Sequence, residues 1–269
     1  MRILVLGGTL FIGPAAVRRL AASGHEVAVF HRGKSNAPLP DNVQHIHGDR
    51  AQMGDFAGDF RRFAPEVVVD MRALTDRDGQ MLLELFSGMA RRLVAISSVD
   101  VYRAYDRLRK ADPGPPDPTP LTEDSPLRDR LYPYRDMAKS PEELFYHYDK
   151  ILMEQAVQSA PDTLPASVLR LPMVYGPGDY QHRLFPYLKR MDDGRPAILL
   201  SEGMASWRGE RGYVEDMGEA IFLCAVSEQA AGRTYHVAQK QSMTEAEWVE
   251  RIGAAAGWKG KIVALPEAQ

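Results

Sequence analysis

The chain has 269 residues, of which 45% are apolar, and it is long enough to bury a large core as one α/β unit or as two unequal lobes. Its 33 basic and 36 acidic residues leave a formal net charge of -3, without the positive excess typical of nucleic-acid and membrane surfaces. The single cysteine, Cys224, excludes a disulfide framework and a thiolate metal site and favours a reducing, cytoplasmic compartment. No segment approaches the roughly 18 consecutive apolar residues of a membrane span.

The first half of the chain alternates apolar runs with amphipathic stretches. Continuous valine, isoleucine and leucine runs, such as residues 67–69, indicate strands buried on both faces, as in a parallel sheet covered by helices. The alternation predicts βαβ units with right-handed crossovers. We expect strands at 2–6, 26–30, 43–47, 66–70 and 93–97, and helices at 12–22, 55–63 and 78–89.

The second half is less regular. Residues 103–139 are rich in proline and fit a surface loop better than a polyproline ligand. A helix is expected over 141–159, since the ring of Pro141 suits a first helical turn. Thr244 and Glu247 have the spacing of a capping box at the start of the last helix. The other expected elements are strands at 166–171, 197–200 and 233–237 and helices at 184–191, 214–226 and 245–256.

The first strand runs directly into a glycine-rich turn with the sequence GGTLFIG, and a helical pattern starts at once. A strand, a glycine turn and a helix N-terminus form an anion site, because backbone N–H groups and the helix dipole face the pyrophosphate of a dinucleotide. The turn therefore predicts a dinucleotide cofactor held by Gly7, Gly8, Thr9, Leu10, Phe11, Ile12 and Gly13.

The residues after the second and third strands bear on the type of cofactor. An acidic residue after the second strand would bind the ribose 2′-hydroxyl of NAD, but this chain has Arg32 and Lys34, which suit a 2′-phosphate. We therefore expect NADP, with NAD as the alternative and a solvated basic loop as the competing interpretation. Asp49 and Arg50 follow the third strand, where they could reach the adenine end or simply begin a helix.

Two segments carry groups that suit proton transfer. SSVDVY at 97–102 follows the fifth strand, at the carboxyl edge where ligands bind in open parallel sheets. Tyr146 and Lys150 are four residues apart, which would place them on one face of a helix. A free tyrosine is a poor base at neutral pH, and a nearby ammonium favours its phenolate form. A serine hydroxyl opposite this pair could then hold a substrate oxygen.

This ordered set of motifs resembles the extended and atypical branches of the short-chain dehydrogenase/reductase superfamily, the NAD-dependent epimerase/dehydratase group. The similarity continues through LRLPMVYGPG at 169–178 and GYVEDM at 212–217. The resemblance implies an α/β fold with a doubly wound parallel Rossmann sheet at 1–170, to which 213–238 returns, and a small substrate lobe at 171–212 and 239–269. It also implies that Tyr146 is the general acid/base, that Lys150 activates it and anchors the nicotinamide ribose, and that Ser98 orients the substrate oxygen.

This chain departs from the family pattern at one position of the glycine turn, and the resemblance predicts further contacts to the cofactor and substrate. Leu10 stands where the family has its middle glycine, so its side chain must point away from the pyrophosphate. The GGTxFIG form of the turn is similar to an atypical subgroup of reductases and chloroplast RNA-associated proteins. The resemblance places Pro172, Met173 and Val174 beside the nicotinamide, and we expect Met71 to contact the cofactor as well. The expected substrate contacts are Arg103, Tyr175, Arg208 and Arg211.

The expected chemistry is hydride transfer between NAD(P) and a carbinol or carbonyl carbon of a small molecule, such as a nucleotide sugar, in a reduction, an epimerisation or a dehydration. The alternative is a non-catalytic NAD(P)-binding protein associated with RNA. The pI near 6.2 and the complete set of Ser98, Tyr146 and Lys150 disfavour that alternative. The basic run at 103–110 fits a solvated loop better than a site for an anionic substrate or RNA.

Two further expectations concern metals and assembly. The histidines at 31, 45, 47, 147 and 182 have no spacing typical of a metal site, so we expect no metal. The resemblance implies a homodimer, because family members commonly pair two helices from each subunit. The matching helices here are 78–89 and 141–159. Their outer faces are expected to carry Met81, Leu85, Phe145 and Met153, and the alternative is that these residues pack against the sheet.

Overall fold

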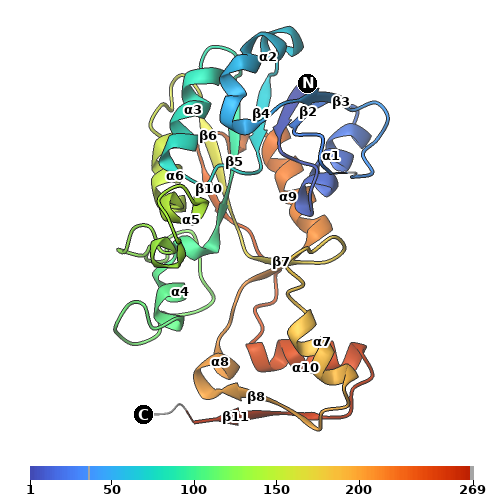
Figure 1. Ribbon diagram of the computed structural model, residues 1–269, viewed down its shortest axis with the longest axis vertical. Helices are drawn as coiled ribbons and strands as arrows, with labels where there is room; N and C mark the ends of the chain where they lie inside the picture. The colour runs from blue at the N-terminus through green and yellow to red at the C-terminus, as the bar shows by residue number, and fades with distance from the viewer. Residues whose placement is uncertain (36, 267–269) are drawn as a thin grey trace.

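The computed structural model describes residues 1–35 and 37–266. Seven parallel strands form one sheet in the order β10-β6-β5-β4-β1-β2-β3 (Figure 1). The order reverses at β1, which lies between β2 and β4, and this confirms the doubly wound Rossmann-like sheet. The strands are β1 (Arg2–Leu6), β2 (Glu26–His31), β3 (Gln44–His47), β4 (Val67–Asp70), β5 (Arg92–Ser98), β6 (Ala166–Leu171) and β10 (Thr234–His236).

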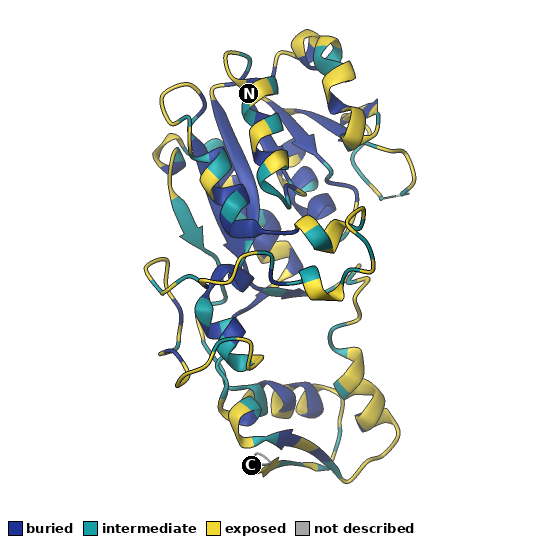
Figure 2. Cartoon of the chain, turned by 60° about the vertical axis from the view of Figure 1, so that its left-hand side comes forward, coloured by how far each residue is buried: buried dark blue, intermediate teal, exposed yellow. Residues whose placement is uncertain are grey.

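Helices cover both faces of the sheet (Figures 1 and 2). Alternate residues of β1 enter different cores, so Ile3 packs with α1 (Ile12–Ala22) and α9 (Val214–Val226), whereas Leu4 packs on the face of α2 (Ala57–Phe63), α3 (Asp76–Phe86) and α6 (Lys150–Val157). Gly79 allows α3 to approach α6, because a Cβ atom there would lie 2.7 Å from the Cβ of Ala156. Both faces of the sheet are therefore buried, as its apolar runs predict.

A small lobe lies at the opposite end of the molecule from the N-terminus (Figure 1). It contains α7 (Phe185–Asp192), β8 (Ala197–Ser201), α8 (Glu202–Ser206), α10 (Glu245–Ala255) and β11 (Lys261–Leu265). Its core is separate and includes Met191, Ile198 and Trp248. The expected capping box of Thr244 and Glu247 is present at the start of α10. Between the lobe and the main sheet, β7 (Met173–Tyr175) pairs with β9 (Arg211–Tyr213).

The proline-rich stretch at 103–139 runs along the carboxyl side of the sheet. It is mostly irregular, but it includes α4 (Arg103–Leu108) and a short 3-10 helix, η3 (Arg135–Met137). Val101, Tyr102 and Leu121 bury a small apolar cluster beneath it. The remaining short elements are η1 (Arg50–Phe56), η2 (Val99–Val101), α5 (Leu144–His147) and η4 (Glu228–Ala230).

The helix residues expected at a dimer surface differ in their exposure. Met153 was expected on an outer helix face, but its side chain is completely buried against the sheet, so that part of the expected dimer face is wrong. Phe145 is 48% exposed, and Met81 and Leu85 are partly buried. Among the described residues no helix is both long and apolar enough to cross a membrane.

Candidate active site

The glycine turn after β1 has the backbone of a phosphate-binding turn. Gly7 and Gly8 have φ angles of 96° and 81°, a region that favours glycine. A Cβ atom on Gly13 would lie only 2.4 Å from the Cα of Gly8, so α1 begins in direct contact with the turn. Phe11, which precedes α1, makes no side-chain cap. The N–H of Gly13 donates to the Leu10 carbonyl at 3.0 Å and Pro14 has no N–H, so at this end of the helix the N–H of Ile12 is left for another acceptor. These residues fit the pyrophosphate of a dinucleotide.

The side chain that replaces the middle glycine is not packed into the protein. Leu10 is 64% exposed. Phe11 has a φ of 49°, and its ring lies edge-on to Tyr180 at 6.3 Å. The guanidinium of Arg183 lies 5.9 Å from the same ring. The loop after β7 therefore covers the start of α1 at Ile12.

The residues after β2 remain available at the surface. Arg32 and Lys34 are exposed, and no carboxylate in the described part of the chain forms an ion pair with either. The Ser35 hydroxyl donates to the hydroxyl of Thr9 at 2.7 Å, which ties this loop to the glycine turn. The two cations therefore lie on a loop that is joined to the predicted pyrophosphate site.

Asp49 and Arg50, the candidates for the adenine end, already have protein partners. The Asp49 carboxylate accepts from the N–H of Ala51 at the start of η1. Arg50 pairs with Asp70 at 2.7 Å and with Asp78 at 2.9 Å. Burial opposes the charge on Asp78, but the charge of Arg50 and the hydrogen bonds from Arg50, Leu74 and Thr75 together lower the pKa of Asp78. Asp49 thus acts as the cap of η1. Arg50 links η1 to β4 and α3 through its two ion pairs.

The remaining candidates for cofactor contact lie where two strands end. Met71 follows β4, and its N–H donates to the Leu6 carbonyl at 3.0 Å. A Cβ atom on Gly7 would lie 3.2 Å from the Met71 Cβ, so this side chain borders the turn. Pro172 separates β6 from β7, in which Met173 is partly exposed and Val174 is buried.

The helix expected over 141–159 is interrupted, and this corrects the predicted geometry of the Tyr-x-x-x-Lys motif. α5 ends at His147, Tyr148 and Asp149 have extended backbones, and α6 starts at Lys150. The cause is Asp149, whose carboxylate accepts from the N–H groups of Ile151 and Leu152 and so begins a new helix. Tyr146 and Lys150 therefore do not share one helix face, and Pro141 lies outside either helix.

Lys150 is buried beneath the carboxyl edge of the sheet. Its ammonium donates to the backbone carbonyl of Ala73, in the segment after β4, and to that of Ile96, within β5. Burial lowers the pKa of Lys150 to about 8, and the surrounding carboxylates, Asp100 first among them, oppose that shift. The position of this cation is fixed by the main chain and does not depend on Tyr146.

Three tyrosines lie near this edge in different environments. The hydroxyls of Tyr148 and Tyr134 donate to Asp100 at 2.8 and 3.0 Å. Burial, together with the charge of Asp100, raises the pKa of Tyr134 to about 12 and that of Tyr148 well above its usual range. Tyr146 is half-buried, and the Arg135 guanidinium lies 4.6 Å from its ring centroid. Tyr134 and Tyr148 therefore hold their protons, and Tyr146 is outside their network.

The two serines at the end of β5 have different partners. Ser97 is buried and donates to Glu154 at 2.5 Å. The Ser98 hydroxyl accepts from the N–H of Asp100 at 3.2 Å and is partly exposed, so its own proton is available to another oxygen. A carboxylate oxygen of Asp100 is buried without a hydrogen-bond partner among the described residues. Of the two serines, Ser98 is the one placed to bind a ligand.

A buried polar network that was not predicted from the sequence lies beside this edge. Glu154 of α6 pairs with Arg170 of β6 at 2.8 Å, and both side chains are buried. Arg170 also donates to the Tyr102 hydroxyl, which lies 3.2 Å from His236. The signal was a glutamate four residues after Lys150 and an arginine inside an apolar strand. The network holds α6, β6 and β10 together.

The basic residues expected to contact substrate are neutralised by acidic neighbours or bound by the main chain. Arg103 pairs with Asp117 at 2.8 Å. Arg211 pairs with Glu245, while Arg208 donates to the Ser242 carbonyl at 2.7 Å. Tyr175 instead packs its ring against other aromatic rings, Trp248 among them at 5.0 Å. The contacts of Tyr175 and Arg211 join the β7–β9 pair to the small lobe.

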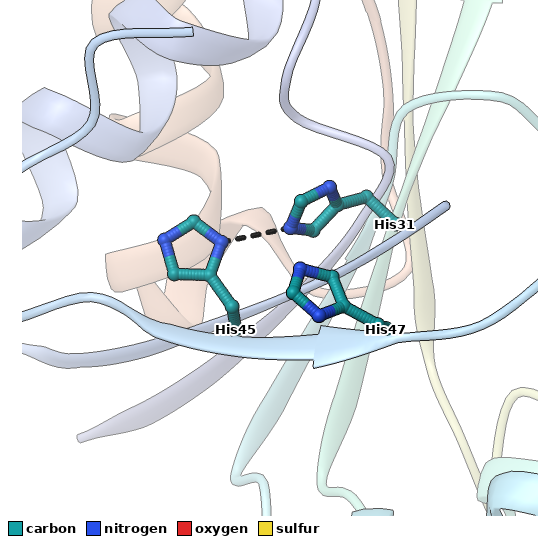
Figure 3. Close-up of side chains that lie close together, drawn as sticks. All are labelled: His31, His45 and His47. Carbon is teal, nitrogen blue, oxygen red and sulfur yellow. Dashed lines mark hydrogen bonds between the residues drawn. The ribbon is translucent and has the colours of Figure 1, made fainter. Parts of the chain in front are cut away.

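Histidines that looked scattered along the chain gather in the structure. His31, His45 and His47 lie together at the end of β2 and on β3 (Figure 3). This cluster is separate from the polar groups at the ends of β4 and β5.

Comparisons with known proteins agree with this architecture. A model of the NAD dependent epimerase/dehydratase family matches residues 3–238. The chain is 28% identical to 2'-dehydrokanamycin reductase of Streptomyces kanamyceticus over 99% of its own length and 70% of that protein. It is 23% identical to the chloroplast stem-loop binding protein of 41 kDa b of Arabidopsis thaliana over 90% of its own length, and it spans 60% of that relative. UDP-glucose 4-epimerase of Thermus thermophilus, solved with NAD, has a TM-score of 0.70 at 24% identity, covering 99% of this chain and 86% of that one.

Proposed function

The chain belongs to the NAD dependent epimerase/dehydratase family, and we propose that it is an NAD(P)-dependent oxidoreductase, epimerase or dehydratase acting at a carbinol or carbonyl carbon of a small molecule. The observation that carries this proposal is the β1–α1 turn, where Gly13 packs on Gly8 and the start of α1 has no side-chain cap. When bound, the nicotinamide supplies or accepts the hydride.

The residues that would hold the cofactor lie along the carboxyl edge. Backbone N–H groups of the turn and of α1 would bind the pyrophosphate. Arg32 and Lys34 would bind a 2′-phosphate, and their exposure without an acidic partner supports NADP over NAD. Met71 would border the cofactor on the β4 side and residues 172–174 on the β6 side.

Proton transfer is assigned to Tyr146, with Ser98 and Lys150 in support. The raised pKa values of Tyr134 and Tyr148 make both hydroxyls unsuitable as bases, whereas Tyr146 is not bound to Asp100. Ser98 would donate its free proton to the substrate oxygen and orient it. Lys150 would supply positive charge beneath the edge. Tyr146 and Lys150 lie on separate helices. The effect of the Lys150 charge on the Tyr146 hydroxyl would therefore depend on the position of α5 when the substrate is bound.

The substrate is proposed to bind between the sheet edge and the small lobe formed by 171–212 and 239–269, of which the structure describes residues up to 266. The pairing of Arg103, Arg208 and Arg211 with protein partners leaves little unbalanced positive charge for a highly anionic substrate. A reductase among the relatives supports reduction of a carbonyl group as the reaction. Tyr175 lies on β7, between the main sheet and the small lobe, and would provide an aromatic ring to contact the substrate.

A titration with NADPH tests the proposed cofactor site. We expect one NADPH per chain in isothermal calorimetry, and Gly13→Ala should weaken binding because its Cβ meets the backbone of Gly8. Gly58→Ala is the matched control, since a Cβ at Gly58 has no atom within 4 Å. Circular dichroism of each variant reports whether it is folded. If the wild-type chain binds neither NADPH nor NADH, the proposal is wrong.

One relative favours a second candidate, a nucleotide-binding protein that associates with RNA. The formal net charge of -3 and the paired arginines count against it. A fluorescent stem-loop RNA titrated with the protein at low and physiological salt separates the two. We expect no saturable binding at physiological salt; tight RNA binding together with absence of turnover would favour the second candidate.

A further inference from the structure

Three histidines converge where β2 ends beside the edge strand β3. His31 is the last residue of β2, and it is directly paired in register with His47 of β3. His45 lies two residues before His47, so both project from the same face of the strand. Ile46 between them is buried on the opposite face. Figure 3 shows the three rings turned toward one another.

The ring nitrogens are close enough for shared coordination. One nitrogen from each ring lies within 4.8 Å of the other two. His31 Nε2 is 2.7 Å from His45 Nδ1, and the ring centroids of His31 and His47 are 4.7 Å apart. A hydrogen bond between two imidazoles requires at least one neutral ring, because a fully protonated ring has no acceptor. The cluster therefore favours rings that can coordinate a cation.

The surroundings of His31 disfavour its charged form. Burial lowers the pKa of His31, and the neighbouring charges of His45 and His47 lower it further. In the described part of the chain no carboxylate forms an ion pair with any of the three, so protonation would leave adjacent like charges without compensation. Neutral imidazole is the form that binds metals.

We propose that His31, His45 and His47 form a binding site for one divalent transition-metal ion, such as Zn²⁺ or Co²⁺. Imidazole nitrogens suit these metals, whereas Mg²⁺ and Ca²⁺ prefer oxygen ligands. Zinc–nitrogen bonds are about 2.0–2.1 Å, which places tetrahedral ligands roughly 3.3 Å apart. A bound ion would replace the hydrogen bond between His31 and His45, and the half-buried and exposed rings would have to rotate to reach that spacing. The fourth position would remain open to water.

This inference goes beyond the proposed function and does not depend on it. The ligands come from β2 and β3, whereas the proposed acid–base groups lie after β5 and around α5 and α6. A failure of the metal site would therefore leave the enzyme proposal standing, and the reverse also holds.

The test is a Co²⁺ titration of the full chain, freed of any histidine purification tag and followed by visible absorption. We expect one Co²⁺ per chain with the bands of a low-coordinate site, and displacement of Co²⁺ by Zn²⁺. His45→Gln and, separately, His47→Gln should weaken binding by at least about 100-fold, because the loss of a direct ligand should cost no less than the loss of an outer-shell partner. Both side chains are exposed, so the variants should fold.

His182→Asn is the matched control. His182 is exposed and outside the cluster, and its φ of 50° is one that asparagine tolerates. This variant should bind Co²⁺ as the wild type does. Absence of saturable binding in the wild type, or equal affinity in wild type and His45→Gln, would overturn the proposal.

Discussion

The carboxylate of Asp149 lies 2.7 Å from the guanidinium of Arg128, and neither side chain is exposed to solvent. The same carboxylate accepts from the N–H of Tyr132 and from the first N–H groups of α6. One side chain therefore begins the helix that carries Lys150 and anchors the 103–139 loop to it. This arrangement explains why the Tyr-x-x-x-Lys segment is not a continuous helix.

Removing one partner of this pair should destabilise the protein strongly. Asp149→Ala leaves the Arg128 charge buried and removes the cap, so we expect a loss of about 3–5 kcal/mol in the free energy of unfolding. Urea denaturation followed by circular dichroism measures this loss. Asp59→Ala, which breaks the exposed pair with Arg62, should cost less than about 1 kcal/mol. Equal effects of the two variants would contradict the structural role given to Asp149.

The buried ammonium of Lys150 predicts a particular dependence of stability on pH. Burial lowers its pKa to about 8 from a usual 10.5, so the native state loses this proton first as pH rises. Below about pH 8 both states are protonated and the full cost of the buried charge is present. Between about pH 8 and 10.5 the unfolded state binds more protons, and the cost is relieved. The wild type should therefore gain stability relative to Lys150→Met over that range in urea denaturation. A difference that is constant with pH would contradict the lowered pKa.

Much of the sheet could be predicted from sequence because its signals are local. Continuous apolar runs define buried parallel strands, and the expected helix at 12–22 and strand at 166–171 coincide with α1 and β6. The glycine turn was also predictable, since positive φ and close backbone approach demand residues without a side chain.

The site was less predictable because its geometry depends on distant partners. A four-residue spacing suggests one helix face, but Asp149 stops the helix by pairing with Arg128, which is 21 residues away in sequence. The cations at 50, 103 and 211 looked available because their carboxylate partners lie on other elements. The three histidines come together only through the pairing of β2 and β3, which sequence spacing does not reveal.

The loop after β2 predicts a preference for NADPH over NADH. Arg32→Ala should weaken NADPH binding by about tenfold or more, because a charge-assisted contact to the 2′-phosphate is lost. NADH affinity should hardly change, since NADH has no such phosphate. Fluorescence titration of both cofactors measures the ratio. Lys259→Ala, an exposed cation beyond α10, is the control and should leave the ratio unchanged. If Arg32→Ala leaves NADPH affinity as it was, the assignment of this loop fails.

We also predict a homodimer formed through the α3 and α5–α6 side of the sheet. Phe145 is 48% exposed there, and burying such an aromatic ring would stabilise an interface. Light scattering at micromolar concentration should give twice the chain mass, and Phe145→Glu should shift it toward the monomer. Leu223→Glu, at a residue 53% exposed on α9, should remain dimeric. A wild-type monomer would be evidence against this surface.

The role of Tyr146 in proton transfer is tested by comparing the turnover of Tyr146→Phe with that of Tyr148→Phe. The purified enzyme is incubated with NADP⁺ or NADPH and a panel of sugar-derived and simple carbonyl or carbinol compounds, and the change in reduced nicotinamide is followed in a single turnover. We expect wild type and Tyr148→Phe to react, whereas Tyr146→Phe should bind the cofactor normally but lose turnover by at least about 100-fold. Full activity in Tyr146→Phe would exclude Tyr146 as the acid/base.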